Sequence, residues 1–509
     1  MSRSTLWRVL AVALPVLGAL VAPLPAVDLA YHLRAGAEIL DHGAIPSVDT
    51  WTFTAAGRPW LDQQWGAQVL LTLVYRLGGW TGLVLLRAAL VGLAFGLLLV
   101  VIRRRAPRLG APAAALLVVA ALLGSLTALA LRPQLFAVDF FAVTLLLLAI
   151  REDHPRAAWL IPLVAAAWAN LHGTFLLTPA LCGVAWIDDL ATMPPSRSAA
   201  RHRMLAVAVV ATLATALTPF GPGVWGYVST LASNPTIAGR VSEWQPPSPL
   251  TVTGAIVWLS IAGVAILVTA RIVRAIRATG RVVGAIPWPA VLTLLAFGGF
   301  AAVTGRGAAW WPFVAAAVVA PWLAVTDDRG PVTQRSTRST PPLLRRLNVV
   351  VVAFLVLVAV VEMPVWRPIG PAGVPLGSLT YAPQSLADRL DRMPTELRLG
   401  VLNAWNPQVW GSWLELAAPA YRYGVDSRIE LFPTSVWDDY DAIHAGDISL
   451  LDRAGVSVVV TDHDADATLE AALRASDRWA TAFEGCDGDI WVHRSAFAGA
   501  VTTVREACP

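Results

Sequence analysis

The chain has 509 residues, of which 56% are hydrophobic and only 14% are charged. In soluble globular proteins roughly a quarter of the residues are charged. The composition of this chain therefore excludes an ordinary soluble domain and indicates a chain that lies largely in lipid. The net charge of +4 comes from arginine because the sequence contains no lysine, which excludes Schiff-base catalysis and makes a coding bias a simpler explanation than nucleic-acid binding.

A series of apolar runs extends from residue 6 to residue 361, each close to the length that a membrane span needs. We therefore predict an α-helical polytopic membrane protein with about 11 transmembrane helices. The predicted spans are residues 6–25, 80–102, 111–131, 135–150, 157–169, 175–187, 204–217, 250–270, 286–303, 308–325 and 348–361.

Arginine is concentrated in every second loop, as expected for loops on the cytoplasmic side of a membrane. The basic loops include Arg3 and Arg8 and the segments 103–108, 151–156, 197–203, 271–281 and 329–346. This asymmetry predicts a multi-pass protein of the cytoplasmic membrane with a cytoplasmic N-terminus and an extracytoplasmic C-terminus. Alternatively, the basic start and the small residues at 22–26 would also suit a cleaved signal peptide.

The predicted first outer loop, residues 27–64, is the longest polar stretch before the C-terminal region. Its start is typical of a short helix, with Asp28 near the N-cap and Gly43 at the end. Asp28 and His32 are four residues apart and would share one face of that helix, where they could hold a divalent cation. Turn residues and aromatic residues follow, which predicts an ordered loop containing Asp49.

The C-terminal region alternates strand-like and helical patterns. Strands are predicted at residues 400–403, 456–461 and 490–493, and helices at 408–416, 435–444 and 467–475. This alternation predicts an extracytoplasmic α/β domain at 364–509, following a transmembrane domain at 1–363. Cys486 and Cys508 could form a disulfide if that domain is outside the cell, whereas Cys182 lies in an apolar run and is expected to be buried.

The sequence lacks the common motifs of several classes of soluble enzymes. The sequence contains no GxxxxGK[ST], HExxH or GxSxG, and no GxGxxG between a strand and a helix. What remains is an acid directly after the first span, inside a long ordered loop on the predicted outer side.

The first loop resembles the first extracytoplasmic loop of the GT-C glycosyltransferase superfamily, in a bacterial and largely uncharacterised branch. The loop segments that carry the resemblance are Asp28-x-x-Tyr31-His32, Gly43-x-Ile45-Pro46-x-x-Asp49 and Gly57-Arg58-Pro59-Trp60. Similar segments follow at Arg132-Pro-Gln134, Asn170-Leu-His172-Gly173, Pro219-Phe-Gly221, Glu243-Trp244-Gln245, Trp410-Gly411, Asp426-x-Arg428 and Glu430-Leu-Phe432-Pro433.

The resemblance implies a membrane glycosyltransferase that uses a polyprenyl-phosphate-linked sugar at the outer face, with a first-loop acid as general base and inversion at the anomeric carbon. The expected acceptor is a cell-envelope glycan, lipid or protein. In many relatives two acids are adjacent in this loop, whereas Leu29 follows Asp28 here. The metal site of the oligosaccharyltransferase branch is therefore not carried over, and the metal dependence stays open.

The predicted catalytic residues are Asp28, His32 and Asp49, because a carboxylate can take the proton of an acceptor group as the new bond forms. The predicted substrate-binding residues are Arg132, His172, Glu243 and Arg306. Either arginine could hydrogen-bond the departing lipid phosphate.

Each of these candidate residues also has a structural interpretation. Asp28 could cap a helix, Asp49 could stabilise a turn, and the two histidines could be packed. Glu243 could be a solvated loop acid, and the two arginines could extend along lipid to reach water.

Two other functions remain open from the sequence alone. A transporter or flippase would call for ionisable residues within the spans or for paired broken helices in two repeated halves. Only Asp139 lies well inside a predicted span, and no repeat of the halves is visible. A non-catalytic membrane scaffold whose C-terminal domain binds a component of the cell envelope is the other alternative.

Overall fold

The computed structural model describes residues 1–280, 286–324, 341–396, 402–496 and 501–508. The predicted basic-loop residues Arg281, Arg329, Arg335 and Arg338 lie outside these ranges. Residue contacts divide the chain into two compact units. The helical unit comprises Met1–Ala22, Val84–Thr230 and Ala238–Met363, and the sheet unit comprises Pro23–Leu83, Leu231–Ile237 and Pro364–Pro509.

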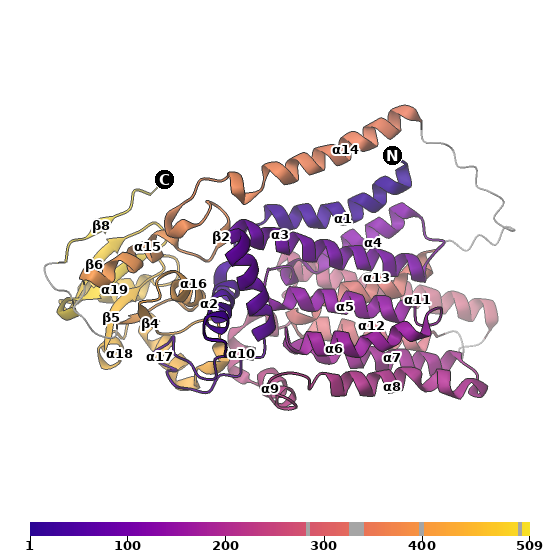
Figure 1. The fold of residues 1–509 in the computed structure, drawn as a ribbon, viewed down its shortest axis with the longest axis horizontal. Helices are drawn as coiled ribbons and strands as arrows, with labels where there is room; N and C mark the ends of the chain where they lie inside the picture. The colour runs from indigo at the N-terminus through magenta and orange to yellow at the C-terminus, as the bar shows by residue number, and fades with distance from the viewer. Residues whose placement is uncertain (281–285, 325–340, 397–401, 497–500, 509) are drawn as a thin grey trace. The chain divides into compact units, whose positions relative to one another are not determined.

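The helical unit contains a helix in the region of every predicted span (Figure 1). Its helices are α1 (Arg3–Val21), α4 (Ala111–Gly124), α5 (Pro133–Ala149), α6 (Ile161–Ala169), α7 (Leu177–Thr192), α8 (Ser198–Ala214), α11 (Val252–Thr279), α12 (Trp288–Val303), α13 (Trp311–Leu323) and α14 (Pro342–Val361). The long helix α3 (Trp65–Arg105) begins in the sheet unit and ends in the helical unit. It is interrupted at Gly79, whose φ of 56° is readily adopted only by glycine.

Five helical segments in the described residues are long and apolar enough to cross a membrane: Arg3–Val21, Trp65–Arg105, Gly173–Thr192, Val252–Thr279 and Pro342–Val361. Four shorter apolar helices, α4, α5, α12 and α13, have 13 to 17 residues each. A shorter helix can still cross where neighbouring protein surrounds its ends. The number of about eleven crossings therefore remains a prediction.

The core of the helical unit forms around α13. Every residue from Trp311 to Ala320 is buried, although most helices of this unit bury only one stripe. Aromatic contacts join α13 and the segment before it to three other helices, through Phe95 of α3, Phe141 of α5 and Trp168 of α6. Outward-facing leucines and valines are exposed on the outer helices, which suits surfaces that face lipid.

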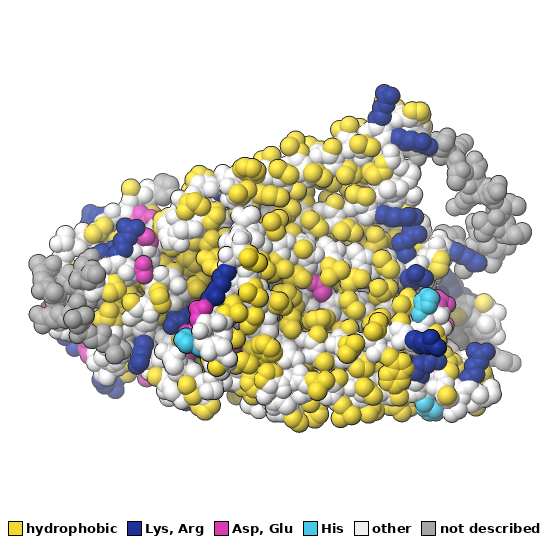
Figure 2. Space-filling model, viewed as in Figure 1, with side chains coloured by type: hydrophobic (Ala, Val, Ile, Leu, Met, Phe, Trp, Pro, Cys, Tyr) yellow, Lys and Arg dark blue, Asp and Glu magenta, His cyan; other side chains and the backbone are white. Residues whose placement is uncertain are grey.

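Basic side chains gather at the end of the helical unit where α1 begins, and hydrophobic side chains cover its middle (Figure 2). The described basic loops after α3, α5 and α7 contribute to this end. The distribution agrees with the arginine asymmetry of the sequence. It leaves the side of the membrane on which each terminus lies as a prediction.

The sheet unit contains a six-stranded sheet in the order β4-β3-β5-β7-β6-β8. Its strands are β3 (Leu402–Trp405), β4 (Tyr421–Tyr423), β5 (Val456–Val460), β6 (Trp479–Glu484), β7 (Asp489–His493) and β8 (Val504–Arg505). Strands β4, β3 and β5 are parallel, and β7 is antiparallel to both β5 and β6. The principal helices are α15 (Gln384–Arg392), α16 (Gln408–Ala417), α17 (Thr434–His444), α18 (Ser449–Arg453) and α19 (Ala467–Ala475).

The first loop also belongs to the sheet unit. It contains β1 (Leu24–Pro25), which pairs with β2 (Leu379–Thr380), and α2 (Ala26–His42), which packs against α16. Gly43 ends α2 in the left-handed conformation, as the sequence predicted. Farther along the loop, Thr52 pairs in parallel with Tyr423 at the outer edge of β4.

Residues 400 and 401 of the predicted strand 400–403 lie outside the described residues, and β3 covers the other two. The other predicted strands and the predicted helices of the C-terminal region are present, and Cys486 is paired with Cys508 as the sequence suggested. Cys182 is free and buried. The short strands β4 and β8, the six-residue strand β6 and the helices α15 and α18 had not been predicted. A unit boundary falls at Met363, next to the predicted domain start at residue 364, although the contacts group the first loop with the C-terminal region.

Candidate active site

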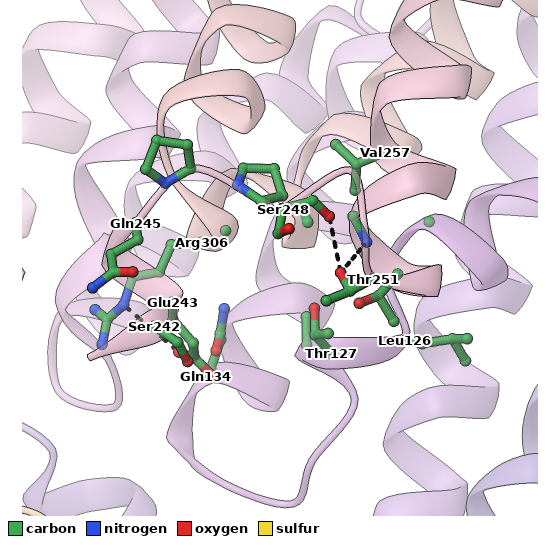
Figure 3. Close-up of a pocket in the computed structure, with 18 of the residues that line it drawn as sticks. Leu126, Thr127, Gln134, Ser242, Glu243, Gln245, Ser248, Thr251, Val257 and Arg306 are labelled. Atoms are coloured by element: carbon green, nitrogen blue, oxygen red, sulfur yellow. Dashed lines mark hydrogen bonds and ion pairs between the residues drawn. The ribbon is translucent and has the colours of Figure 1, made fainter. Parts of the chain in front are cut away.

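A cavity of about 300 Å³ opens in the helical unit and is lined mainly by loops and short 3-10 helices. Three of these short helices contribute: η1 (Leu126–Ala128), η5 (Ser242–Trp244) and η6 (Gly305–Ala309). Glu243, Gln134 and Arg306 lie on one side, and Ser248 and Thr251 lie on the other (Figure 3). Apolar side chains of α4 and α11 complete the lining, so the cavity combines a charged end with an apolar wall.

Three of the four predicted substrate-binding residues meet at the charged end. Arg132 donates hydrogen bonds from Nη2 to Oε1 of Glu243 and, at 2.7 Å, to Oε1 of Gln134. The Nε atom of Arg306 lies 3.8 Å from Oε2 of Glu243. Two guanidinium groups therefore share one carboxylate at this end of the cavity.

The backbone around this cluster fixes the positions of the side chains. The amide of Gly305 donates to the carbonyl oxygen of Gln245 at 2.9 Å, which joins η6 to the segment after η5. A Cβ atom on Gly307 would lie 2.4 Å from backbone atoms of Ala301, so only glycine fits there. The guanidinium of Arg306 also lies 4.4 Å from the ring centre of Trp244. These contacts preorganise the two arginines before any ligand binds.

His172 lies elsewhere in the helical unit, at the start of η3 (Gly173–Leu176). Its Nδ1 atom accepts from the amide of Thr174 and is 2.8 Å from the hydroxyl of the same residue. The side chain is 7% exposed and is not among the residues that line the cavity. The structure therefore does not bring His172 together with the arginine cluster.

Asp28 and His32 both lie on α2, in the sheet unit. Asp28 is the third residue of the helix and is half-buried, and Pro25 occupies the N-cap position without a capping side chain. Asp28 therefore lies in the first turn of the helix, three residues after the N-cap residue and near the N-cap as expected. His32 is buried and its ring lies 3.9 Å from that of Tyr31.

An ion held by Asp28 and His32 remains a prediction. Among the described residues, a group of three His, Cys, Asp or Glu side chains that are close enough to share an ion is formed elsewhere, by His463, Glu470 and Asp489.

Asp49 is fully buried within the sheet unit. Its carboxylate accepts from the hydroxyl of Thr52 at 2.6 Å and from the amide of the same residue at 3.1 Å. Arg428 donates to it from Nη2 at 2.7 Å. These partners satisfy the carboxylate within the fold, and none of them is another predicted site residue.

Arg428 is the centre of a buried network that the sequence interpretation missed. Besides Asp49, its guanidinium binds Asp426, with a Nε–Oδ2 distance of 2.9 Å. It also lies 4.1 and 4.5 Å from the ring centres of Trp51 and Trp60. Burial alone would lower the pKa of Arg428, but the surrounding carboxylates raise it above its usual value, so the side chain stays charged.

Two further buried acids had no assigned role. Burial, reinforced by Asp426, raises the pKa of Glu415 well above its ordinary value. Burial also raises the pKa of Asp62 to about 7, although a hydrogen bond from Gln68 at 2.6 Å opposes this. The segment Asp426-x-Arg428 was visible in the sequence, but nothing there indicated that it pairs with a loop residue 379 positions away.

No established protein family matches the sequence, and no curated protein matches it. Solved structures do match. The oligosaccharyltransferase of Archaeoglobus fulgidus with a tethered acceptor peptide containing the NVT sequon is 12% identical, with a TM-score of 0.54 over 94% of this chain and 72% of that one. The archaeal oligosaccharyltransferase AglB from Archaeoglobus fulgidus, in complex with an inhibitory peptide and a dolichol-phosphate, matches with 11% identity, a TM-score of 0.53 and the same coverage.

This chain shares the fold of the A. fulgidus oligosaccharyltransferase. The match covers nearly its whole length, so both the helices and the C-terminal region take part. A third structure, the A. fulgidus enzyme in complex with Zn and sulfate, matches with 12% identity and a TM-score of 0.54 over 97% of this chain and 73% of that one. The GT-C resemblance that the first loop suggested is thereby confirmed as a fold, and the apolar helices make the chain a multi-pass membrane protein.

Proposed function

We propose that this GT-C chain is a glycosyltransferase that moves a sugar from a polyprenyl-phosphate-linked donor to an acceptor at the outer face of the cytoplasmic membrane. The observation that carries the proposal is the cluster of Arg132, Glu243 and Arg306 beside an apolar wall, within a GT-C fold. A donor of this kind has an apolar chain and an anionic phosphate, and the cavity offers surfaces suited to both.

In this proposal Asp28 is the general base. Its carboxylate takes the proton of the acceptor group as that group attacks the anomeric carbon and the bond from this carbon to the phosphate oxygen breaks. The lipid phosphate leaves with the bonding electrons, and Arg132 and Arg306 stabilise its charge. Glu243 contacts both guanidinium groups and holds them in place, so that water is not their only partner.

The same proposal gives Asp49 a structural role. A carboxylate that is fully buried and bound to Thr52 and Arg428 has no access to an acceptor. The C-terminal region would then support acceptor binding without supplying the base. The disulfide between Cys486 and Cys508 agrees with an extracytoplasmic position for this region.

The test is an assay of the purified chain with labelled polyprenyl-phosphate sugars. We expect Asp28→Asn to fold normally and to lose roughly 10²-fold or more of the transfer rate, because the amide has the same shape but cannot take a proton. Asp41→Asn, at an exposed carboxylate of the same loop, is the control and should leave the rate unchanged. Near-native transfer by Asp28→Asn would show that another group is the base.

A second pair of variants tests the phosphate site. Arg306→Gln should raise KM for the lipid-linked donor, because it removes one of the two positive charges that line the cavity. The control is Arg240→Gln, which changes an exposed arginine that does not line the cavity. If the native chain transfers no sugar from any such donor yet still binds a cell-envelope component, the chain is a scaffold and not an enzyme.

A further inference from the structure

Three segments of the sheet unit converge at one end of β5. His463 follows this strand, Glu470 lies on α19, and Asp489 is the first residue of β7. The amide of Thr461 donates to the carbonyl oxygen of Asp489 at 3.0 Å, and the amide of His463 donates to that of Asp487 at 3.2 Å. The three side chains are thus held together by the sheet, at positions that the proposed glycosyl transfer does not use.

The potential ligand atoms of these side chains all lie within 4.8 Å of one another. Nδ1 of His463 is 2.9 Å from Oε1 of Glu470, and Nε2 is 3.7 Å from Oδ1 of Asp489. The carboxylate side chains are only 11% and 6% exposed, whereas the imidazole is 39% exposed. An ion could therefore reach the imidazole side from solvent and find two largely buried carboxylates behind it.

Contacts on both sides hold the imidazole of His463 in one orientation. Nε2 lies 3.1 Å from the carbonyl oxygen of Gly485, which can only accept, so a hydrogen on Nε2 would be directed to that oxygen. Nδ1, on the other side of the ring, faces Glu470. Oε1 of Glu470 also accepts from the hydroxyl of Thr461 at 2.8 Å, which fixes the carboxylate. Nδ1 and the carboxylate are thus positioned so that both could contact one ion.

We propose that His463, Glu470 and Asp489 bind a divalent first-row transition metal ion in the C-terminal region. Two ligands that each lie about 2.1 Å from one ion at a right angle are about 3 Å apart, which fits the spacing of Nδ1 and Oε1. One imidazole and two carboxylates, with no sulfur, suit Zn²⁺ or Mn²⁺ better than the all-oxygen sites of Ca²⁺ and Mg²⁺. The hydrogen bond from Nε2–H to Gly485 is the kind of contact that orients a metal-binding imidazole.

The charge around the site also favours a cation. Asp487 lies close enough to interact electrostatically with both Asp462 and His463. Metal binding would join the hairpin between β6 and β7 to the end of β5 and to α19. The expected role is therefore to stabilise the C-terminal region, independently of whether the chain transfers sugars.

The test uses the full-length chain in detergent, stripped with a chelator and with its disulfide kept oxidised so that no thiolate competes for the ion. We measure Zn²⁺ binding by calorimetry and by thermal unfolding. The native chain should bind Zn²⁺ and unfold at a higher temperature with it. His463→Gln and Asp489→Asn should each weaken this binding roughly tenfold or more.

The matched control is His493→Gln, in the same region, where the imidazole lies 3.7 Å from one carboxylate, that of Asp452. It should bind Zn²⁺ as the native chain does. Asp28→Asn should also keep the site, which separates it from any ion at the proposed catalytic residues. Should the stripped native chain bind no Zn²⁺, or should all variants bind it equally, the metal site is refuted.

Discussion

Asp62 shows how one buried side chain can couple stability to pH. Its carboxyl group is 3% exposed and accepts from the amide of Gln68, while its Oδ2 atom has no hydrogen-bond partner in the described part of the chain. Burial raises its pKa from 3.8 to about 7. Between these pH values the folded protein keeps a proton that the unfolded chain releases, so the free energy of unfolding should fall as the pH rises from about 4 to about 7.

Asp62→Asn should remove this dependence, because asparagine accepts the same hydrogen bond and has no proton to lose. Each pKa unit corresponds to about 1.4 kcal/mol, so the stability gained by the variant should be greater at pH 8 than at pH 5 by on the order of 2 kcal/mol. Thermal unfolding in detergent at the two pH values measures this difference, with Asp41→Asn as the exposed control. Equal gains at both pH values would mean that Asp62 is ionised throughout.

At the scale of elements, the first loop is held to the C-terminal region by a buried ion pair and by strand pairing. The amide of Phe53 donates to the carbonyl of Tyr423 at 3.0 Å, and the amide of Tyr423 donates to that of Trp51 at 3.1 Å. Ser427 adds a hydrogen bond from its hydroxyl to the carbonyl oxygen of Val27 at 3.0 Å, directly before Asp28. The start of α2 is therefore positioned by residues near the far end of the chain.

Arg428→Met should destabilise this arrangement strongly. The change leaves Asp49 and Asp426 buried without their cation, a situation that typically costs about 3–5 kcal/mol. Thermal unfolding should show a large loss of stability for Arg428→Met, whereas Arg422→Met, on the exposed side of β4, should lose little stability. If Arg428→Met unfolds at the same temperature as the native chain, the network does not stabilise the contact between the loop and the C-terminal region. Asp49 would then again be a candidate catalytic residue.

The elements that the sequence predicted correctly are those with a strong local signal. Apolar runs, the Gly43 stop and the strand-helix alternation each depend on neighbouring residues. The pairing of Asp49 with Arg428 and the meeting of Arg132, Glu243 and Arg306 depend on contacts between distant segments, which no local pattern reports. Short strands such as β4 were not predicted, because three residues are too few to show the alternation of buried and exposed side chains that is typical of a strand.

At the scale of the whole molecule, the membrane limits the possible arrangements of the chain. Lipid cannot satisfy exposed backbone groups, so the apolar runs must be helical if they cross it, and the described helices agree with this requirement. Which side each loop occupies is set by arginine, which is favoured on the cytoplasmic side. Basic side chains gather at one end of the helical unit (Figure 2), and the sequence pattern predicts that this end faces the cytoplasm.

This orientation can be tested by single cysteines and a thiol reagent that does not cross membranes. Ser47 in the first loop and Ala420 before β4 are exposed and should be labelled from outside intact cells after replacement by cysteine. Ser196, exposed in the loop between α7 and α8, should be labelled only after the cells are opened.

The native cysteines leave a low background, because Cys182 is buried and the other two form a disulfide. Labelling of Ser196→Cys from outside, with Ser47→Cys protected, would invert the topology. The proposed base would then face the cytoplasm, where an outer-face donor cannot reach it.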